Sequence, residues 1–159
     1  MKVLLLLISI YIFMFAEIKF SETKYLSALD VEMTKYGSMN YEKNILKLSY
    51  IKPVKEFITY YEDKLILQND KNESKEYTYE EHPSIEYFGL LLKSIVSNSY
   101  ENLDNMFEVK DAKDKKVLTA KSSISSTVDY LEVFNKDNNL SSVIFYMTNK
   151  DKITIETIN

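Results

Sequence analysis

The strongest strand signal in the sequence is EFITYYEDKLILQND, residues 56–70. Side chains of a strand point alternately to the two faces of its sheet, so a sheet with one solvated face is apolar at every second position. Here both alternating sets are largely apolar: one contains Phe57, Thr59, Tyr61, Leu65 and Leu67, and the other contains Ile58, Tyr60 and Ile66. We therefore expect two strands, at residues 55–61 and 64–69, and a second layer that covers one of their faces.

The rest of the chain predicts more strands around one helical block. Alternating segments bounded by turn residues occur at residues 18–29, 35–43, 46–50, 76–80, 107–110, 116–121, 130–135, 140–148 and 152–158. Pro53 ends the strand at 46–50, because it offers no amide donor. The connections are short, so strands that follow one another in the sequence are expected to pair in an antiparallel meander.

A helix is predicted at residues 82–98, HPSIEYFGLLLKSIVSN, where the period changes. Apolar residues recur there at helical spacing, with Pro83 or Ser84 in the first turn. Gly89 weakens this helix by about 1 kcal/mol relative to Ala and permits close packing on the sheet. A short turn at residues 100–106 is expected to follow.

These elements predict a mainly β protein of the α+β kind. About ten strands form a curved antiparallel sheet, an incomplete barrel, and the helical block covers its concave face. Tyrosines on the other face can keep their hydroxyl groups in water. On this interpretation Tyr60 does not need to be buried, and Ile58 and Ile66 are ordinary single exposures.

The N-terminus predicts export. Lys2 precedes an uncharged segment, residues 3–16, and Glu17 and Lys19 follow at once. Such a segment has the length and charged front of a signal peptide and is too short to span a bilayer comfortably. We expect residues 1–16 to be a signal peptide cleaved after Ala16 and residues 17–159 to form a single domain. An uncleaved N-terminal anchor is the alternative.

Composition and motifs give no support for catalysis. The formal charge is −4, which argues against nucleic acid as a partner, and the absence of Cys means that stability must come from burial rather than disulfides.

His82 is the only histidine and is expected to begin the helix; Ser122, Ser123, Ser125 and Ser126 are expected to form a loop. Asp111 and Asp114 lie in a Lys-rich turn. We expect no enzyme, no catalytic residue, no metal and no cofactor.

The order of elements resembles that of the LolA-type lipoprotein carriers of the bacterial periplasm. The resemblance covers nearly all of the chain after the signal segment. It rests on the motif L-x-L-x-Y-x-x-P, at Leu46, Leu48, Tyr50 and Pro53, on the helix after Pro83, and on an F-x-V strand at Phe107 and Val109. The chain departs from the family in three ways. A strand, not an amphipathic helix, follows the signal; Lys43 stands near the family's usual arginine; and Leu48 stands where tryptophan is frequent.

The resemblance implies an incomplete barrel whose apolar cavity accepts the acyl chains of a lipoprotein and ferries it from the inner towards the outer membrane. Its partners would be a lipoprotein or another lipid, an inner-membrane donor and an outer-membrane acceptor, and we expect a monomer. Such a cavity would be lined by Leu46, Leu48, Tyr50, Phe57, Leu65, Leu67, Phe88, Leu92 and Ile95. The alternative is a soluble or membrane-tethered interaction or sensor domain of the same fold, in which these side chains fill a plain core.

Overall fold

A computed structural model describes residues 17–158 of the chain. The predicted signal peptide, residues 1–16, lies outside the described residues. The strands are β1 (Ile18–Leu26), β2 (Val31–Glu42), β3 (Ile45–Lys52), β4 (Glu56–Tyr60), β5 (Lys64–Asn69), β6 (Ser74–Thr78), β7 (Phe107–Asp111), β8 (Lys115–Ala120), β9 (Val128–Lys136), β10 (Asn139–Met147) and β11 (Lys152–Ile158). The helices are α1 (Pro83–Ser97) and the short 3₁₀ turn η1 (Glu101–Leu103). Every strand and helix expected after residue 17 is present, although β1 ends at Leu26 rather than at residue 29 and β2 begins at Val31 rather than at residue 35.

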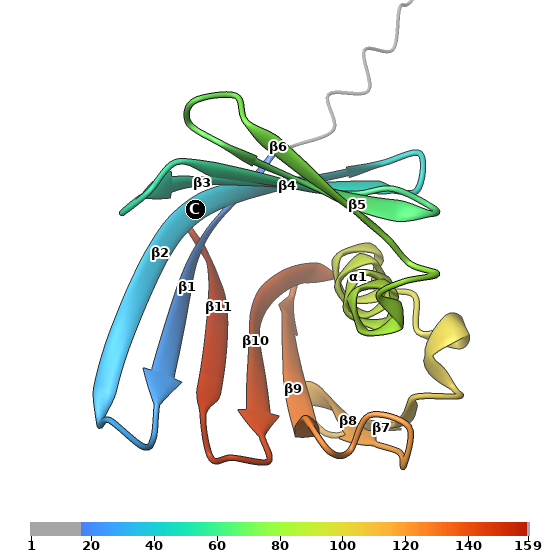
Figure 1. Cartoon of the computed structure of the whole chain (residues 1–159). Coiled ribbons are helices and arrows are strands. Elements are labelled where there is room, and N and C mark those ends of the chain that lie inside the picture. The colour runs from blue at the N-terminus through green and yellow to red at the C-terminus, as the bar shows by residue number, and fades with distance from the viewer. Residues whose placement is uncertain (1–16, 159) are drawn as a thin grey trace, which may run out of the picture.

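All eleven strands form one antiparallel sheet in the order β6-β5-β4-β3-β2-β1-β11-β10-β9-β8-β7. The sheet therefore consists of two meanders, β1–β6 and β7–β11, which are joined where β1 pairs with β11. It curves so strongly that β3–β6 lie on one side of α1 and β7–β10 on the other (Figure 1). The predicted mainly β fold, a curved and unclosed antiparallel sheet with a helix on its concave side, is confirmed.

Helix α1 connects the two edge strands, because the chain leaves β6 at one end of the sheet and enters β7 at the other. Pro83 stands in its first turn, where no amide donor is needed. Asn98 ends the helix in a left-handed conformation, with φ of 52°, and its N–H donates to the carbonyl of Ile95. No helix among the described residues is long and apolar enough to cross a membrane.

Gly89 allows α1 to approach the sheet closely. A Cβ atom at this position would lie 2.7 Å from Cδ1 of Tyr60 on β4, which is closer than real Cβ contacts. The close packing that Gly89 suggested is therefore present.

The expectation that Tyr60 and Ile58 lie on the solvent-exposed face is wrong. Tyr60 is only 5% exposed and belongs to the core, and Ile58 is half-buried and packs against that core. The register explains why: Tyr60 pairs with Leu46 and with Leu65, and Ile58 pairs with Leu48 and with Leu67. Directly paired residues share a face of the sheet. Ile58 and Tyr60 thus point to the concave side.

Candidate functional site

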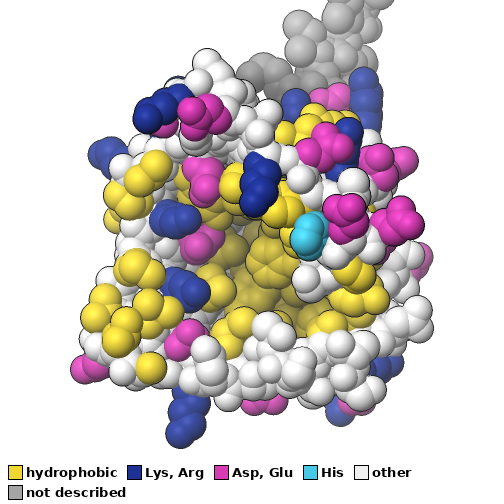
Figure 2. Space-filling model, viewed as in Figure 1, with side chains coloured by type: hydrophobic (Ala, Val, Ile, Leu, Met, Phe, Trp, Pro, Cys, Tyr) yellow, Lys and Arg dark blue, Asp and Glu magenta, His cyan; other side chains and the backbone are white. Residues whose placement is uncertain are grey.

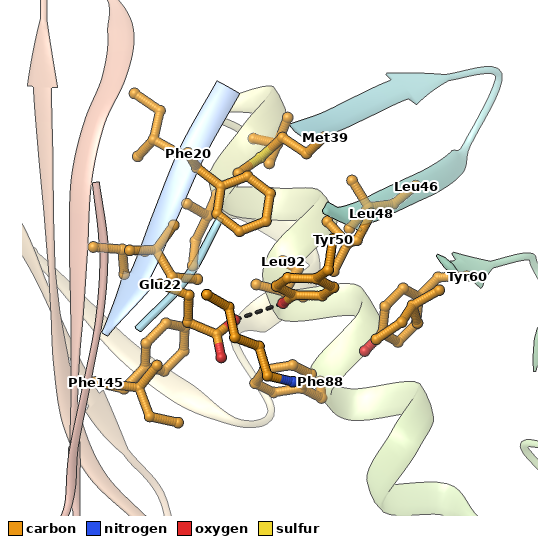
Figure 3. A pocket seen from close by; sticks show the side chains of 18 residues that line it. Phe20, Glu22, Met39, Leu46, Leu48, Tyr50, Tyr60, Phe88, Leu92 and Phe145 are labelled. Carbon is orange, nitrogen blue, oxygen red and sulfur yellow. Dashed lines mark hydrogen bonds between the residues drawn. The ribbon is translucent and has the colours of Figure 1, made fainter. Parts of the chain in front are cut away.

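An apolar cavity of about 210 Å³ lies between the concave face of the sheet and α1. Side chains from both meanders and from the helix surround it (Figure 3). The apolar lining residues are Phe20, Met39, Leu46, Leu48, Tyr50, Ile58, Tyr60, Phe88, Leu92, Ile95, Val96, Leu140, Val143, Phe145, Ile153 and Ile155. Viewed as in Figure 1, the surface has a hollow with hydrophobic side chains on its floor (Figure 2).

The sheet wall begins with the motif on β3. Leu46, Leu48 and Tyr50 alternate with exposed or half-exposed residues and are all buried, so they form a single inward row. Leu46 and Leu48 pair with Tyr60 and Ile58 of β4, which also line the cavity and extend the wall towards the edge of the sheet. On the other side, Met39 of β2 pairs with Leu48 and continues the wall towards the centre.

The helix wall comes from residues that are three and four positions apart. Phe88, Leu92 and Ile95 lie on one face of α1 and point into the cavity. Leu92 and Ile95 are buried, whereas Phe88 is 39% exposed. The Phe88 ring lies 6.0 Å from the ring of Phe145 on β10, so helix and sheet are in contact through these two aromatic side chains.

The cavity has one polar side, formed by Glu22 and Lys35, which are paired neighbours on β1 and β2. The Tyr50 hydroxyl donates to a carboxylate oxygen of Glu22 at 2.5 Å (Figure 3). Lys35 Nζ lies 5.0 Å from the centre of the Tyr50 ring and 3.7 Å from a carboxylate oxygen of Glu56. Burial, followed by the charge of Glu22, raises the pKa of Tyr50 above its ordinary value of 10.0. The phenol is therefore neutral and acts as a donor at physiological pH.

Six of the nine residues expected to contact lipid line this cavity: Leu46, Leu48, Tyr50, Phe88, Leu92 and Ile95. Leu65 and Leu67 point to the same face and pack into or against the core, but they do not line the cavity. The prediction that Phe57 lines the cavity is wrong. It pairs with Ser49 and Gln68 and so faces away from the row of Leu48.

Sequence reasoning missed the lining residues of β1, β2, β10 and β11. Phe20, Val143, Phe145 and Ile155 are almost fully buried and complete the wall opposite β3. Their alternation within strands was visible, but the pairing of β1 with β11 has no local signal. Glu22 and Lys35 were missed for a different reason, because single charged residues in a strand usually face solvent.

The other polar residues considered in the sequence lie at the start of α1 and in turns. His82 precedes α1 as expected, and its ring lies 5.4 Å from the ring of Tyr77 in an edge-on contact. The four predicted loop serines lie in the turn between β8 and β9. Lys43, near the family's arginine position, is an exposed turn residue with φ of 50°. Within residues 17–158, no group of three His, Asp or Glu could hold a metal ion.

Comparison with known proteins adds little to this picture. No family profile matches the sequence, and no similar protein was found among curated proteins. A crystal structure of a DUF1329 family protein from Desulfovibrio piger is similar, with a TM-score of 0.41 and 7% sequence identity. The match covers 90% of this chain and 83% of that chain. Similarity at this level carries no argument about function, so the candidate site rests on its own geometry.

Proposed function

We propose that the protein is an exported carrier that binds acyl chains of a lipoprotein or another lipid in the cavity between its sheet and α1. The observation that carries the proposal is the cavity itself, which is apolar on nearly every side and lies between two structural elements. An acyl chain gains about 0.8 kcal/mol for each methylene that it buries. It therefore needs an apolar space rather than a set of converging polar groups.

The cavity also has a place for the polar end of such a ligand. Glu22, Lys35 and the Tyr50 hydroxyl all belong to one side of the lining, and Lys35 is about half exposed. A lipid can keep its head group beside these charges while its chain lies against Leu48 and Leu92. The site would then bind many lipids of one shape rather than a single species.

Uptake of a full-length chain requires α1 to move. The volume of about 210 Å³ lies below the range of about 300–1,000 Å³ that is usual for small-molecule pockets. The helix is joined to the sheet by loops at both edges, so it can shift away from the concave face without breaking a strand pair. In this mechanism α1 is a lid, and ligand binding holds it in an open position.

Export and transfer complete the proposal. Residues 1–16 would direct the chain to the periplasm, and the protein would carry its ligand from the inner towards the outer membrane, as the resemblance to LolA-type carriers implies. Fractionation of cells should find the processed protein in the soluble periplasmic fraction. An unprocessed protein held in the membrane fraction would instead favour a tethered domain.

Lipid binding can be tested with a matched pair of variants. Ile58 and Ile66 are both half-buried and lie on neighbouring strands, but Ile58 lines the cavity whereas Ile66 pairs with Thr59 and Glu76 on the opposite face. The wild type, purified from the periplasm, should carry acyl species that mass spectrometry detects, and it should bind a fluorescent fatty acid. Ile58→Trp fills the cavity and should weaken that binding about tenfold or more, equivalent to losing about two buried methylenes.

Ile66→Trp adds the same bulk outside the cavity and should bind like the wild type. Circular dichroism of both variants checks that the sheet is intact. Absence of any acyl species, together with no binding of the fluorescent fatty acid, would contradict the carrier proposal.

A second candidate function, an interaction domain, is favoured by exposed apolar residues in the β1–β2 turn and around the end of β3. Leu29 before β2 is 69% exposed, Ile51 near the end of β3 is 62% exposed, and Val54 between β3 and β4 is 64% exposed. In a carrier these turns would contact the donor and acceptor proteins. In a pure interaction domain they would be the only functional surface, and Ile58→Trp would change nothing but stability.

A further inference from the structure

A second apolar cavity lies against α1. Its volume is about 260 Å³, it is partly open to solvent, and it is lined by α1, the start of β7, the loop between β8 and β9 and the first residue of β9. Leu91, Met106, Phe107 and Ile124 form most of its apolar wall. No sequence pattern predicts this cavity, because the loop at residues 121–127 was interpreted only as a polar connection.

The two cavities meet at one side chain. Phe88 lines both of them, whereas the consecutive residues Leu91 and Leu92 line the second and the first cavity respectively. Helix α1 therefore divides one apolar space into two compartments. Phe88 is 39% exposed, so this dividing side chain lies at the surface of the protein.

We propose that the second cavity binds the second acyl chain of the same ligand, so that the substrate class is a lipid with two chains. This inference rests on the proposed carrier function. One chain lies between α1 and the concave face of the sheet, and the other lies between α1 and the β8–β9 loop. Phe88 separates the chains near their common attachment point.

The chemistry of the second cavity fits this role. Its wall is mainly apolar, but Ser84 of α1 and Ser123, Ser126 and Thr127 of the β8–β9 loop also line it. Hydroxyl groups can donate to the ester or amide oxygens by which acyl chains are attached to a head group. Neither cavity alone reaches the size usual for a lipid-sized ligand, and the two together hold more chain than either one.

The test compares lipids that differ only in the number of chains. Octanoyl-lysophosphatidylglycerol has one chain and dioctanoylphosphatidylglycerol has two, and their affinities can be measured by isothermal titration calorimetry. Ile124→Trp adds bulk to the second cavity from the β8–β9 loop. It should lower the affinity for the two-chain lipid about tenfold and leave that for the one-chain lipid unchanged. Ile58→Trp should lower both affinities.

Ser126→Trp, from the exposed part of the same loop, is a second variant that should have the same selective effect if Ile124→Trp fails to fold. The inference is overturned if variants in the second cavity change neither affinity, or if they lower both equally. Failure of the wild type to bind either lipid is a different result, because it contradicts the carrier function itself.

Discussion

The Tyr50 hydroxyl is the most strongly perturbed titratable group of the candidate site. Burial first, and then the carboxylate of Glu22, raise its pKa above the ordinary value of 10.0. Burial also raises the pKa of Tyr60, and it raises the pKa of Tyr79 to about 12. These phenols keep their protons in the folded state at a pH at which the unfolded chain has begun to lose them.

Stability should therefore fall in alkali. Above about pH 10 the unfolded state binds fewer protons than the folded state, so the free energy of unfolding decreases as pH rises towards the folded-state pKa values. Urea unfolding between pH 8 and pH 11 should show this decrease, and Tyr50→Phe should make it less steep. Tyr36→Phe, at a position 43% exposed on β2, is the control and should follow the wild type. Equal slopes for Tyr50→Phe and wild type would mean that Tyr50 does not titrate with unfolding.

At Gly89, helix propensity and close packing have opposite effects on stability. Replacing Gly by Ala in a helix interior stabilises the helix by about 1 kcal/mol. Here the new Cβ would lie 2.7 Å from the buried ring of Tyr60, and overpacking costs about 1–3 kcal/mol. Gly89→Ala should therefore lower the free energy of unfolding by up to about 2 kcal/mol, measured by urea denaturation.

The cause can be separated by changing the neighbour. Tyr60→Val keeps a residue suited to strands and has no atom at the position of the clash. In that background, Gly89→Ala should stabilise the protein by about 1 kcal/mol, because only the helix propensity remains. A loss of stability in both backgrounds would show that the ring of Tyr60 is not what restricts this position.

At the scale of elements, Lys93 connects α1 to the sheet by a hydrogen bond. It is 7% exposed, and its ammonium group donates to the Tyr61 carbonyl at 2.9 Å. The Tyr79 hydroxyl donates to the same carbonyl at 3.1 Å. One backbone oxygen at the end of β4 thus accepts hydrogen bonds from the helix and from the segment that leads into it.

Lys93→Met keeps the length and packing of the side chain but removes this bond. A hydrogen bond to a charged group contributes about 1.5–3 kcal/mol, so amide hydrogens of α1 should exchange about tenfold faster or more. Hydrogen–deuterium exchange with mass spectrometry over residues 83–97 measures this. Lys47→Met, at an exposed position of β3, is the control. Slower exchange in Lys93→Met would mean that apolar packing, not the hydrogen bond, holds the helix.

The order of elements could be predicted from the sequence because its signals are local. A period of two residues marks the strands, and the change at Pro83 to helical spacing marks α1. The face to which each side chain points is a different matter. In the β4–β5 hairpin, Tyr60 pairs with Leu65, so even-numbered residues of β4 share a face with odd-numbered residues of β5. Alternation within one segment does not contain that register, which is why Phe57 was placed in the cavity and Tyr60 was not.

The cavity was predictable only in part, because local sequence patterns also do not show which distant strands pair. Its β3 and α1 walls come from compact motifs, whereas Phe20, Phe145 and Ile155 come together because strands from the two ends of the domain pair. The second cavity depends on how a loop packs beside Leu91, and loops have no periodicity that predicts packing. The sequence therefore predicted the β3 and α1 walls of the first cavity, but neither its opposite wall nor the second cavity.

At the scale of the whole molecule, the pairing of β1 with β11 holds the two meanders together. Lys19 lies opposite Ile158 and Tyr25 opposite Lys152, so β1 is hydrogen-bonded along most of its length to β11 and also to β2. The curvature that encloses the cavity needs both halves of the sheet, because each half supplies one wall. The site and the junction of the meanders therefore form or fail together.

A proline placed in this junction should abolish the fold, whereas one at the edge of the sheet should not. Ser21 in β1 pairs with both Tyr36 and Glu156, so Ser21→Pro removes an amide from a strand with two partners. Ser74 begins the edge strand β6, where proline is tolerated. Circular dichroism and thermal unfolding should find Ser21→Pro without a cooperative transition and Ser74→Pro folded, within about 1 kcal/mol of the wild type. A cooperatively folded Ser21→Pro would mean that each meander is stable by itself, and the cavity would then be an interface between two independent units.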